Sequence, residues 1–213
     1  MPRIDEIRRA LASYEPKLHE RESQRRASVA LVLRDAGPTG SEILFIERAE
    51  KEGDPWSGHM AFPGGRVEGV AESPEEAAVR ETHEEVGLWL GSGERLGRLD
   101  DLEGRHAGRP QGMVISAFVY HLNDHAELVR QESEVREAFW VPVRSLVEPG
   151  RHVQRAFRGT GSFVFPGIVV GEPDRHVVWG LTYRFLEVFF QAMGRPFTDR
   201  WEGVRGIDPI RGA

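Results

Sequence analysis

Apolar residues along the chain recur at helix-like and strand-like spacings in several short stretches. Isoleucine and leucine follow a helical period within residues 2–14, which predicts a short amphipathic helix. The apolar run at residues 27–33 predicts a buried strand, residues 35–40 a turn, and residues 43–46 the returning strand of a hairpin. The first fifth of the chain is therefore expected to form a helix followed by a strand hairpin.

The rest of the pattern mixes strands and helices without strict alternation. Residues 53–65 are rich in glycine and proline and are expected to form a loop, followed by a helix at residues 74–86. Further strands are predicted at residues 95–99, 113–122 and 139–141, and a buried final helix at residues 177–193. This order predicts an α/β or α+β fold in which helices cover a mixed sheet. We expect three parts: an N-terminal helical extension (1–24), one main domain (25–195) and a C-terminal tail (196–213).

Composition narrows the functional class. The 213 residues suit one domain with appendages, and the absence of cysteine excludes disulfide scaffolds, thiol nucleophiles and Cys-ligated zinc. No apolar run approaches the roughly 20 residues that span a bilayer, so a cytoplasmic enzyme without membrane contact is the default expectation. The net charge of −6 argues against a nucleic-acid partner. Assembly into a homodimer is a possibility that the sequence leaves undecided.

The predicted helix at residues 74–86 has well-defined end signals. Ser73 is placed as the N-cap, Pro74 occupies the first helical position, and Glu76 completes a Ser-x-x-Glu capping box. Gly87 can adopt the left-handed conformation that ends a helix. These signals make this helix the most firmly predicted element of the chain.

Three carboxylates of this helix, those of Glu81, Glu84 and Glu85, fall on one arc. Val79 and Val86 point the opposite way, toward the expected core. Neighbouring carboxylates repel, and a hard divalent cation such as Mg²⁺ or Mn²⁺ would convert that repulsion into coordination. For an isolated Glu-x-x-Glu-Glu, a solvated acidic face is the commoner explanation. Residues 68–85 contain seven acids and one arginine, so the net charge of this segment alone equals that of the whole chain.

The wider segment resembles the signature of Nudix hydrolases. That signature has a glycine, five residues, a glutamate, seven residues, and then Arg-Glu-aliphatic-x-Glu-Glu-x-Gly-aliphatic. Glu72 and the run from Arg80 to Leu88 match its second half. Two positions depart from it: six residues separate Gly65 from Glu72, and Thr82 replaces the aliphatic residue.

The resemblance implies a three-layer α-β-α sandwich with a mixed central sheet, and a role for each matching residue. It implies that Glu81, Glu84 and Glu85, with the carbonyl of Gly64, bind catalytic Mg²⁺ or Mn²⁺ ions. Arg80 would orient the glutamates, and Glu72 would anchor the loop that contains Gly65 through an ion pair with Arg80. The implied reaction is hydrolysis of a diphosphate linked to a nucleoside, with Glu81 or a loop acid as the general base.

A further motif resembles the coenzyme A diphosphatase branch of the family. Gly58, three residues and Phe62-Pro63-Gly64-Gly65 match its lead-in, Arg48-Ala49 matches the preceding strand end, and Trp179-Gly180-x-Thr182 matches the start of its last helix. One departure bears on the substrate: residues 50–57 are one residue longer than the usual spacer and contain no arginine. Arg48, Arg66 and Lys51 remain as cations for substrate binding.

Two further residues have balanced alternatives. Glu134 precedes a Trp-Val-Pro strand, where related enzymes often place an extra catalytic glutamate; a solvated loop glutamate is equally expected. Trp56 lies on the Gly/Pro-rich loop, where stacking on an adenine and simple packing are equally expected.

These observations predict a Nudix hydrolase that cleaves coenzyme A or its derivatives to 4′-phosphopantetheine and 3′,5′-ADP. The first alternative is another nucleoside diphosphate-linked small molecule: ADP-ribose, NADH, a dinucleoside polyphosphate or an oxidised nucleotide. The second is a non-catalytic nucleotide sensor, a class that usually lacks acids of the signature, whereas all three are present here.

Overall fold

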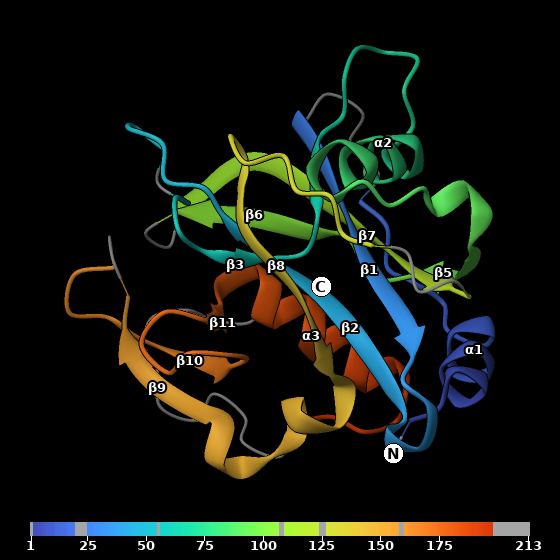
Figure 1. Ribbon diagram of the computed structural model, residues 1–213. Helices are drawn as coiled ribbons and strands as arrows, with labels where there is room; N and C mark the ends of the chain where they lie inside the picture. The colour runs from blue at the N-terminus through green and yellow to red at the C-terminus, as the bar shows by residue number, and fades with distance from the viewer. Residues whose placement is uncertain are drawn as a thin grey trace.

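The computed structural model describes residues 2–19, 25–54, 56–106, 109–123, 127–157 and 160–197. Within them, three α-helices surround a large sheet and a small sheet (Figure 1). The helices are α1 (Ile4–Ala12), α2 (Pro74–Val86) and α3 (Gly180–Ala192). The large sheet contains β1 (Arg25–Asp35), β2 (Ser41–Arg48), β3 (Met60–Ala61), β4 (Gly64–Arg66), β5 (Glu94–Arg98), β6 (Leu102–His106), β7 (Arg109–Leu122) and β8 (Val135–Pro142). The small sheet contains β9 (His152–Ala156), β10 (Val164–Val169) and β11 (Val177–Trp179).

The large sheet is mixed, as predicted. Its central path is β3-β2-β1-β7-β5, in which β1 and β7 are parallel and the other neighbours are antiparallel. β1 and β2 pair with each other only near their shared turn. Further along, β4 pairs with β1 and β3 pairs with β2. The two strands therefore separate, and the segment from β3 to β4 occupies the space between them.

Helices cover both faces of this sheet because its central strands are apolar on both sides. Ala30 and Val32 of β1 share a core with α2, whereas the alternating Leu31 and Leu33 share a core with α1 and α3. The isoleucines and Leu11 of α1 are buried in that second core. The result is the predicted α-β-α layering, with α2 alone on one face.

The last helix begins at Gly180, three residues later than the predicted start at residue 177. Val177 and Val178 do not belong to α3 but pair with β10 as β11. β-branched residues favour extended backbone, and Gly180, at φ +60°, provides the change of direction into the helix. Trp179 consequently ends a strand and lies ahead of α3 rather than within its apolar face.

The segment predicted as one loop, residues 53–65, also contains regular structure. Met60 pairs with Glu47 of β2, and Gly64 pairs with Val29 of β1. β6, β9 and β10 are likewise additional strands that the apolar pattern does not predict. β6 and β9 mix charged and polar residues with few apolar ones, and the apolar residues of β10 are interrupted by Pro166 and Gly167. Strand pairing at these places is set by the neighbouring strands rather than by local composition.

The predicted division into extension, domain and tail stays a prediction. α1 packs into the same core as α3, and residues 198–213 of the predicted tail lie outside the described residues. Among the described helices, each is too short or too polar to cross a membrane.

The capping box of α2 gives a stability prediction. The Glu76 amide donates to Ser73 Oγ at 3.2 Å, and the Ser73 amide donates to Glu76 Oε2 at 2.8 Å. Ser73→Ala removes one acceptor and should lower the free energy of unfolding by about 1 kcal/mol in urea denaturation. Ser73→Asp keeps an acceptor and should retain most of that stability. Equal losses in both variants would contradict the capping explanation.

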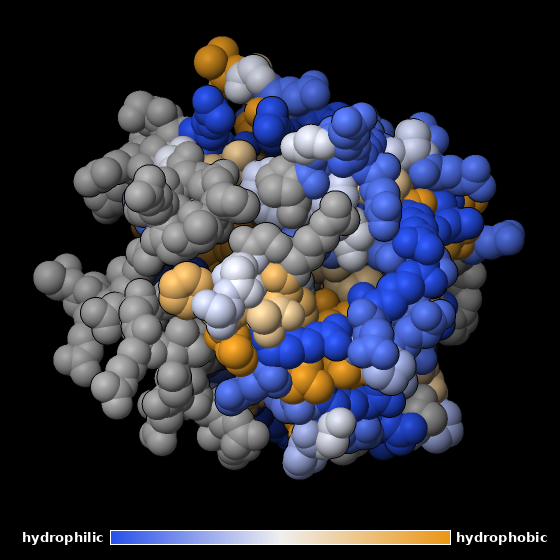
Figure 2. All heavy atoms as spheres, turned by 90° about the vertical axis from the view of Figure 1, so that its left-hand side faces the viewer, coloured by the Kyte–Doolittle hydropathy of each residue, from blue (hydrophilic) through white to orange (hydrophobic). Residues whose placement is uncertain are grey.

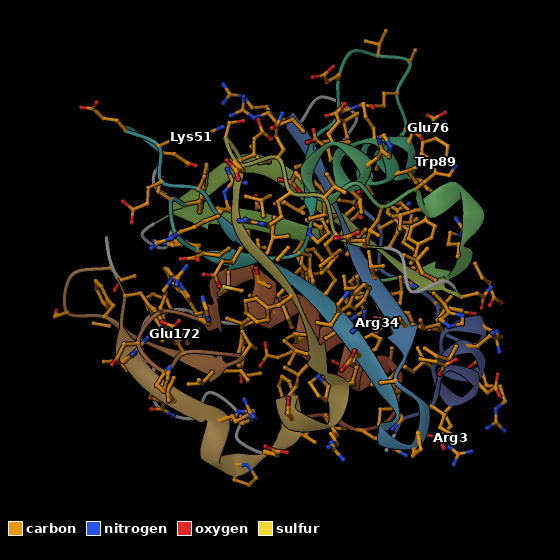
Figure 3. All side chains as sticks on the ribbon, viewed as in Figure 1. Arg3, Arg34, Lys51, Glu76, Trp89 and Glu172 are labelled. Carbon is orange, nitrogen blue, oxygen red and sulfur yellow. The ribbon has the colours of Figure 1, made fainter. Side chains whose placement is uncertain are left out.

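The capping box also predicts how the stability of the protein depends on pH. Hydrogen bonds from Ser73 hold the pKa of Glu76, which projects from the first turn of α2 (Figure 3), below its usual range. A lowered folded-state pKa means that the contribution of this carboxylate is complete above its unfolded pKa and is lost as the pH falls through the folded one. The stability difference between the wild type and Glu76→Gln should therefore close at acidic pH.

Candidate active site

The acidic residues of α2 run from the buried to the exposed side of the helix. Glu85 is 2% exposed, the Glu81 side chain is 14% exposed and the Glu84 side chain is 54% exposed. Glu85 shares the predicted arc with the other two glutamates, but it is buried, as Val86 is, because β4 covers its part of that arc. Thr82 is also buried, and its hydroxyl donates to the Ala78 carbonyl at 2.7 Å, which satisfies the polar group that replaces an aliphatic residue.

Glu85 is buried against β4. The Gly64 amide donates to Glu85 Oε2 at 2.8 Å. Burial raises the pKa of Glu85 to about 8, although the Gly64 hydrogen bond and the nearby Arg48 guanidinium act in the opposite direction. Gly64 pairs with Val29 in the β1–β4 ladder. The ladder contains a bond from the Ala30 amide to the Pro63 carbonyl on one side of this pair and a bond from the Val67 amide to the Arg26 carbonyl on the other. In the alternating antiparallel pattern this makes Gly64 and Val29 a non-hydrogen-bonded pair, whose backbone polar groups point away from the partner strand. The Gly64 carbonyl is therefore not used within this ladder.

Two consecutive glycines allow α2 and β1 to approach this segment closely. A Cβ on Gly64, which has φ +153°, would lie 2.2 Å from the Ser28 carbonyl oxygen. A Cβ on Gly65 would lie 2.2 Å from the carboxyl carbon of Glu81. Gly64 is thus required by the backbone of β1, whereas Gly65 leaves the space that the Glu81 carboxylate fills.

Arg80 connects the acidic residues to the loop before the helix. Its guanidinium contacts Glu72 Oε1 at 2.7 Å, Glu81 Oε1 at 2.9 Å and Glu84 Oε2 at 3.1 Å, and it donates to the Arg66 carbonyl at 3.0 Å. The pKa of Glu72 is held below its usual range by this pairing. The pairing brings Glu72 to Arg80 despite the extra residue that precedes Glu72.

Glu134 approaches the same group of acids from the start of β8. Burial is the main cause that raises the pKa values of Glu81 and Glu85, and the charge of Glu134 adds a smaller contribution in the same direction, as expected for a nearby carboxylate. Glu134 Oε1 is 3.5 Å from Lys51 Nζ, and its carbonyl accepts the Ala49 amide at 2.8 Å. Figure 3 shows Lys51 on the loop that leaves β2. The sequence pattern did not link Lys51 to Glu134, because 83 positions separate them and no spacing rule connects them.

The structure relates the three predicted substrate-binding residues to this group of acids to different degrees. Arg48 hydrogen-bonds Asp54 at 3.1 Å, while its Nε is buried without a hydrogen-bond partner. Trp56 is 37% exposed on the loop after β2, where its amide donates to Asp54. The Arg66 side chain is exposed at the end of β4. Of the three, Arg48 is brought within electrostatic reach of Glu85, and the described contacts of Trp56 are those of its backbone.

The donor set fits hard divalent cations. Burial raises the pKa of Glu81 against the lowering effect of the Arg80 guanidinium, and the charges of Glu84 and Glu134 act in the same direction as burial. Carboxylates and a backbone carbonyl such as that of Gly64, which lies outside the β1–β4 hydrogen bonding, are the oxygen ligands that Mg²⁺ and Mn²⁺ take. Cation binding would offset the cost of keeping these carboxylates ionised together.

A second group of candidate ligands, formed by Glu47, Glu137 and His176, has atoms within 4.8 Å of one another. Here Arg175 supplies the positive charge: its Nε and Nη2 contact both carboxylate oxygens of Glu47, and Nη2 also contacts Glu137 at 2.7 Å. The Glu172 amide donates to His176 Nδ1, so the neutral ring has its proton on Nε2, the nitrogen that faces the carboxylates. That nitrogen then has no lone pair for a metal, and we interpret the group as a buried ion network.

Comparisons with known proteins agree with this geometry. Residues 24–159 match the NUDIX domain family. An uncharacterized protein of Schizosaccharomyces pombe, C14C4.10c, is 34% identical over 157 residues, which cover 65% of this chain and 48% of that protein. A probable nudix hydrolase of the same yeast, C6G9.05, is 27% identical over 154 residues, which cover 72% and 51%. The chain thus spans about half the length of these curated relatives.

A solved structure shares the fold. The MutT/nudix family protein from Enterococcus faecalis superposes with a TM-score of 0.53 at 20% identity, covering 89% of this chain and 69% of that one. At this identity the likeness concerns the fold alone. Because the family match covers well over half of the sequence, the chain belongs to the Nudix hydrolase family.

Proposed function

We propose that this protein hydrolyses the diphosphate of coenzyme A or a coenzyme A derivative, with Mg²⁺ or Mn²⁺ as cofactor. The observation that supports catalysis most directly is the group of four carboxylates on one side of α2 and β4, from Glu81, Glu84, Glu85 and Glu134, of which one is buried. A protein that only needed a stable helix would gain nothing from charges that raise one another's pKa values. The retention of all these acids favours an enzyme over a silent sensor.

In this proposal Glu81, Glu84, Glu85 and the Gly64 carbonyl hold the cations. Bound divalent cations neutralise diphosphate oxygens and make a coordinated water more acidic. Arg80 positions Glu81 and Glu84 through its two short contacts, and Glu72 fixes Arg80 from the other side. The proton of the attacking water passes to a carboxylate, for which Glu81 and Glu134 are the candidates.

The proposal for coenzyme A depends on the sequence motif around Phe62-Pro63-Gly64-Gly65 and on Trp179-Gly180-x-Thr182. The structure joins these two stretches, since Thr182 Oγ1 donates to the Met60 carbonyl at 3.2 Å and Trp179 contacts the His59 ring. Arg48, Arg66 and Lys51 are the cations that we place along the path of the substrate. A nucleoside diphosphate-linked molecule of another kind is the alternative.

A product screen tests the substrate. The protein with Mg²⁺ or Mn²⁺ is incubated separately with coenzyme A, dephospho-coenzyme A, ADP-ribose, NADH, diadenosine polyphosphates and an oxidised nucleoside triphosphate. We expect coenzyme A to give 4′-phosphopantetheine and 3′,5′-ADP on a chromatogram, with a kcat/KM at least tenfold above the others. Cleavage of ADP-ribose or NADH in preference to coenzyme A would replace the proposed substrate. Tight nucleotide binding by calorimetry without any product would favour the sensor.

A further inference from the structure

A cavity of about 410 Å³ lies between the large and the small sheet, on the face opposite α2. β2 and β8 contribute one wall, β9 and β11 the other, and the end of the loop after β2 closes it. The surface in Figure 2 presents the left-hand side of Figure 1, where apolar groups lie between bands of hydrophilic side chains. The cavity has the same mixed character, with arginines and aromatic rings together.

Two arginines face the cavity from opposite walls, Arg136 from β8 and Arg155 from β9. Each has an exposed acidic neighbour: Arg136 is 3.8 Å from Glu50, whose side chain is 68% exposed, and Arg155 is 3.3 Å from Asp174, whose side chain is fully exposed. Arg136 is also 3.6 Å from the buried Glu47, a longer contact than the two that Glu47 makes with Arg175. Exposed pairs contribute little, so an incoming dianion can displace Glu50 and Asp174.

A third arginine, Arg175, does not share this freedom. Arg175 donates hydrogen bonds to both carboxylate oxygens of Glu47, which is 1% exposed, and so neutralises the one buried acid among the residues that line the cavity. With Glu47 neutralised and the other two acids at the rim, the cavity presents Arg136 and Arg155 as donors. Two guanidinium groups that converge from opposite sides are suited to a phosphate monoester, whose three terminal oxygens can accept from both.

Aromatic rings form a further part of the cavity surface. Trp179 and Phe157 are stacked with ring centroids 4.3 Å apart, and the His59 ring meets Trp179 edge-on at 4.8 Å. The Arg155 guanidinium lies 5.4 Å from the centre of the Phe157 ring. A phosphate beside an apolar aromatic wall fits a phosphorylated sugar or nucleoside better than a free inorganic ion.

The cavity adjoins the candidate active site through shared segments. Glu47 faces the cavity, while Arg48, the next residue of β2, is within reach of Glu85 on the other side. Glu50 lies at the cavity and Lys51 contacts Glu134. One molecule can therefore extend from the carboxylates of α2 around the end of β2 into the cavity.

We propose that this cavity binds a phosphomonoester on the ribose of the substrate, with Arg136 and Arg155 as its ligands. This inference rests on the proposed function, because it takes the substrate to be a nucleotide whose diphosphate lies at α2. It gives the enzyme a preference for coenzyme A over dephospho-coenzyme A, which differ only in that phosphate.

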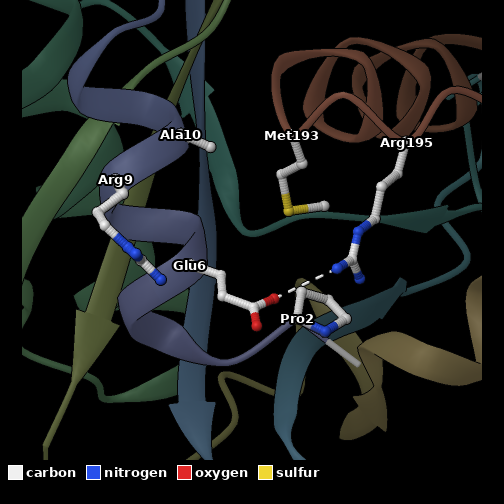
Figure 4. A pocket seen from close by; sticks show the side chains of 6 residues that line it. All are labelled: Pro2, Glu6, Arg9, Ala10, Met193 and Arg195. Atoms are coloured by element: carbon white, nitrogen blue, oxygen red, sulfur yellow. Dashed lines mark hydrogen bonds and ion pairs between the residues drawn. The ribbon is translucent and has the colours of Figure 1, made fainter.

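A second cavity, of about 470 Å³, does not support a comparable proposal. It lies between α1 and the end of α3 (Figure 4), and an ion pair of 3.4 Å between Arg195 and Glu6 crosses it. Arg9 and Arg195 both line it, but Arg195 is paired with Glu6, and the described lining residues include no aromatic ring against which a nucleoside could pack.

The test measures binding of 3′,5′-ADP and 5′-AMP by calorimetry and the kcat/KM ratio for coenzyme A over dephospho-coenzyme A. In the wild type we expect 3′,5′-ADP to bind at least tenfold more tightly, a difference of about 1.4 kcal/mol. Arg155→Ala and Arg136→Ala should each reduce both ratios severalfold. Asp174→Asn removes a fully exposed competitor of the phosphate and should raise them, which tests the cavity even if an arginine variant fails to fold.

Arg144→Ala is the matched control, since it removes an equal charge at an exposed position outside the cavity. Equal affinity of the wild type for the two nucleotides, or ratios that do not respond to Arg155 and Asp174, would overturn the cavity assignment. If coenzyme A is not cleaved but 3′,5′-ADP binds in an arginine-dependent way, the proposed substrate is wrong and the phosphate site stands. If coenzyme A is cleaved and the ratios do not move, the reverse holds.

Discussion

Replacing Glu84 by glutamine is expected to lower Mg²⁺- or Mn²⁺-dependent hydrolysis on the order of 10²–10³-fold, because loss of a cation ligand removes several kcal/mol of charge stabilisation in the transition state. Glu84 is the exposed member of the acidic group and contacts Arg80 at 3.1 Å. Its replacement therefore creates no cavity and should leave the melting temperature of the metal-free protein within a few degrees of the wild type. Turnover with saturating substrate and a Mn²⁺ titration by calorimetry measure the effect.

Glu68→Gln is the control for charge alone. Glu68 is exposed in the same acidic stretch, before the helix, and its substitution changes the net charge by the same amount. It should retain wild-type turnover and Mn²⁺ affinity. If Glu84→Gln retains them as well, the carboxylates of α2 are not the cation site.

The second large effect concerns the paired glycines. Gly65→Ala should reduce activity on the order of 10–100-fold while the protein stays folded, in line with the cost of disturbing groups that orient metal ligands. The added Cβ would lie 2.2 to 2.5 Å from the carboxylate atoms of Glu81. A carboxylate at the end of a flexible side chain can move away, but it then leaves the contact with Arg80 at 2.9 Å.

Gly64→Ala should mainly lower the stability of the fold, whereas Gly65→Ala should mainly lower activity. Its Cβ would meet the Ser28 carbonyl oxygen at 2.2 Å and Val29 Cα at 2.6 Å, and the residue has φ +153°. Backbone atoms of a central strand cannot move away cheaply, and we expect a loss of several kcal/mol of stability. Thermal melting and turnover of both variants separate the two roles. Wild-type activity in Gly65→Ala would mean that Glu81 need not occupy the observed position.

Local signals predicted α2 and its ends. Ser73, Glu76 and Gly87 act within one turn of the helix, so their roles follow from the sequence alone. The helix α1 was equally accessible, because its apolar residues repeat at the helical period, and so was the hairpin of β1 and β2, because two short apolar runs flank a turn signal.

Features that depend on tertiary packing were not accessible in this way. The burial of Glu85 arises because β4 lies against α2, and the helical period alone gives only its arc on the helix, opposite Val86, with no sign that another strand covers that arc. The start predicted for the last helix is too early for a similar reason. Val177 and Val178 are apolar residues that suit a buried helix or a buried strand, and they form a strand because they pair with β10. The contact of Arg175 with Glu47 joins residues 128 positions apart, beyond any spacing rule.

The loop after β2 is closed at its base by two hydrogen bonds, from the Arg48 amide to the His59 carbonyl at 3.1 Å and from the Gly58 amide to the Arg48 carbonyl at 3.2 Å. The spacer with the additional residue lies inside this closure, whereas Gly64 and Gly65 lie outside it. Insertions or deletions in residues 50–57 can therefore change what the loop presents to a substrate without shifting the glycines against α2. The closure separates a part of the chain that can vary in length from one that cannot, and it allows substrate range to diverge while the chemistry is kept.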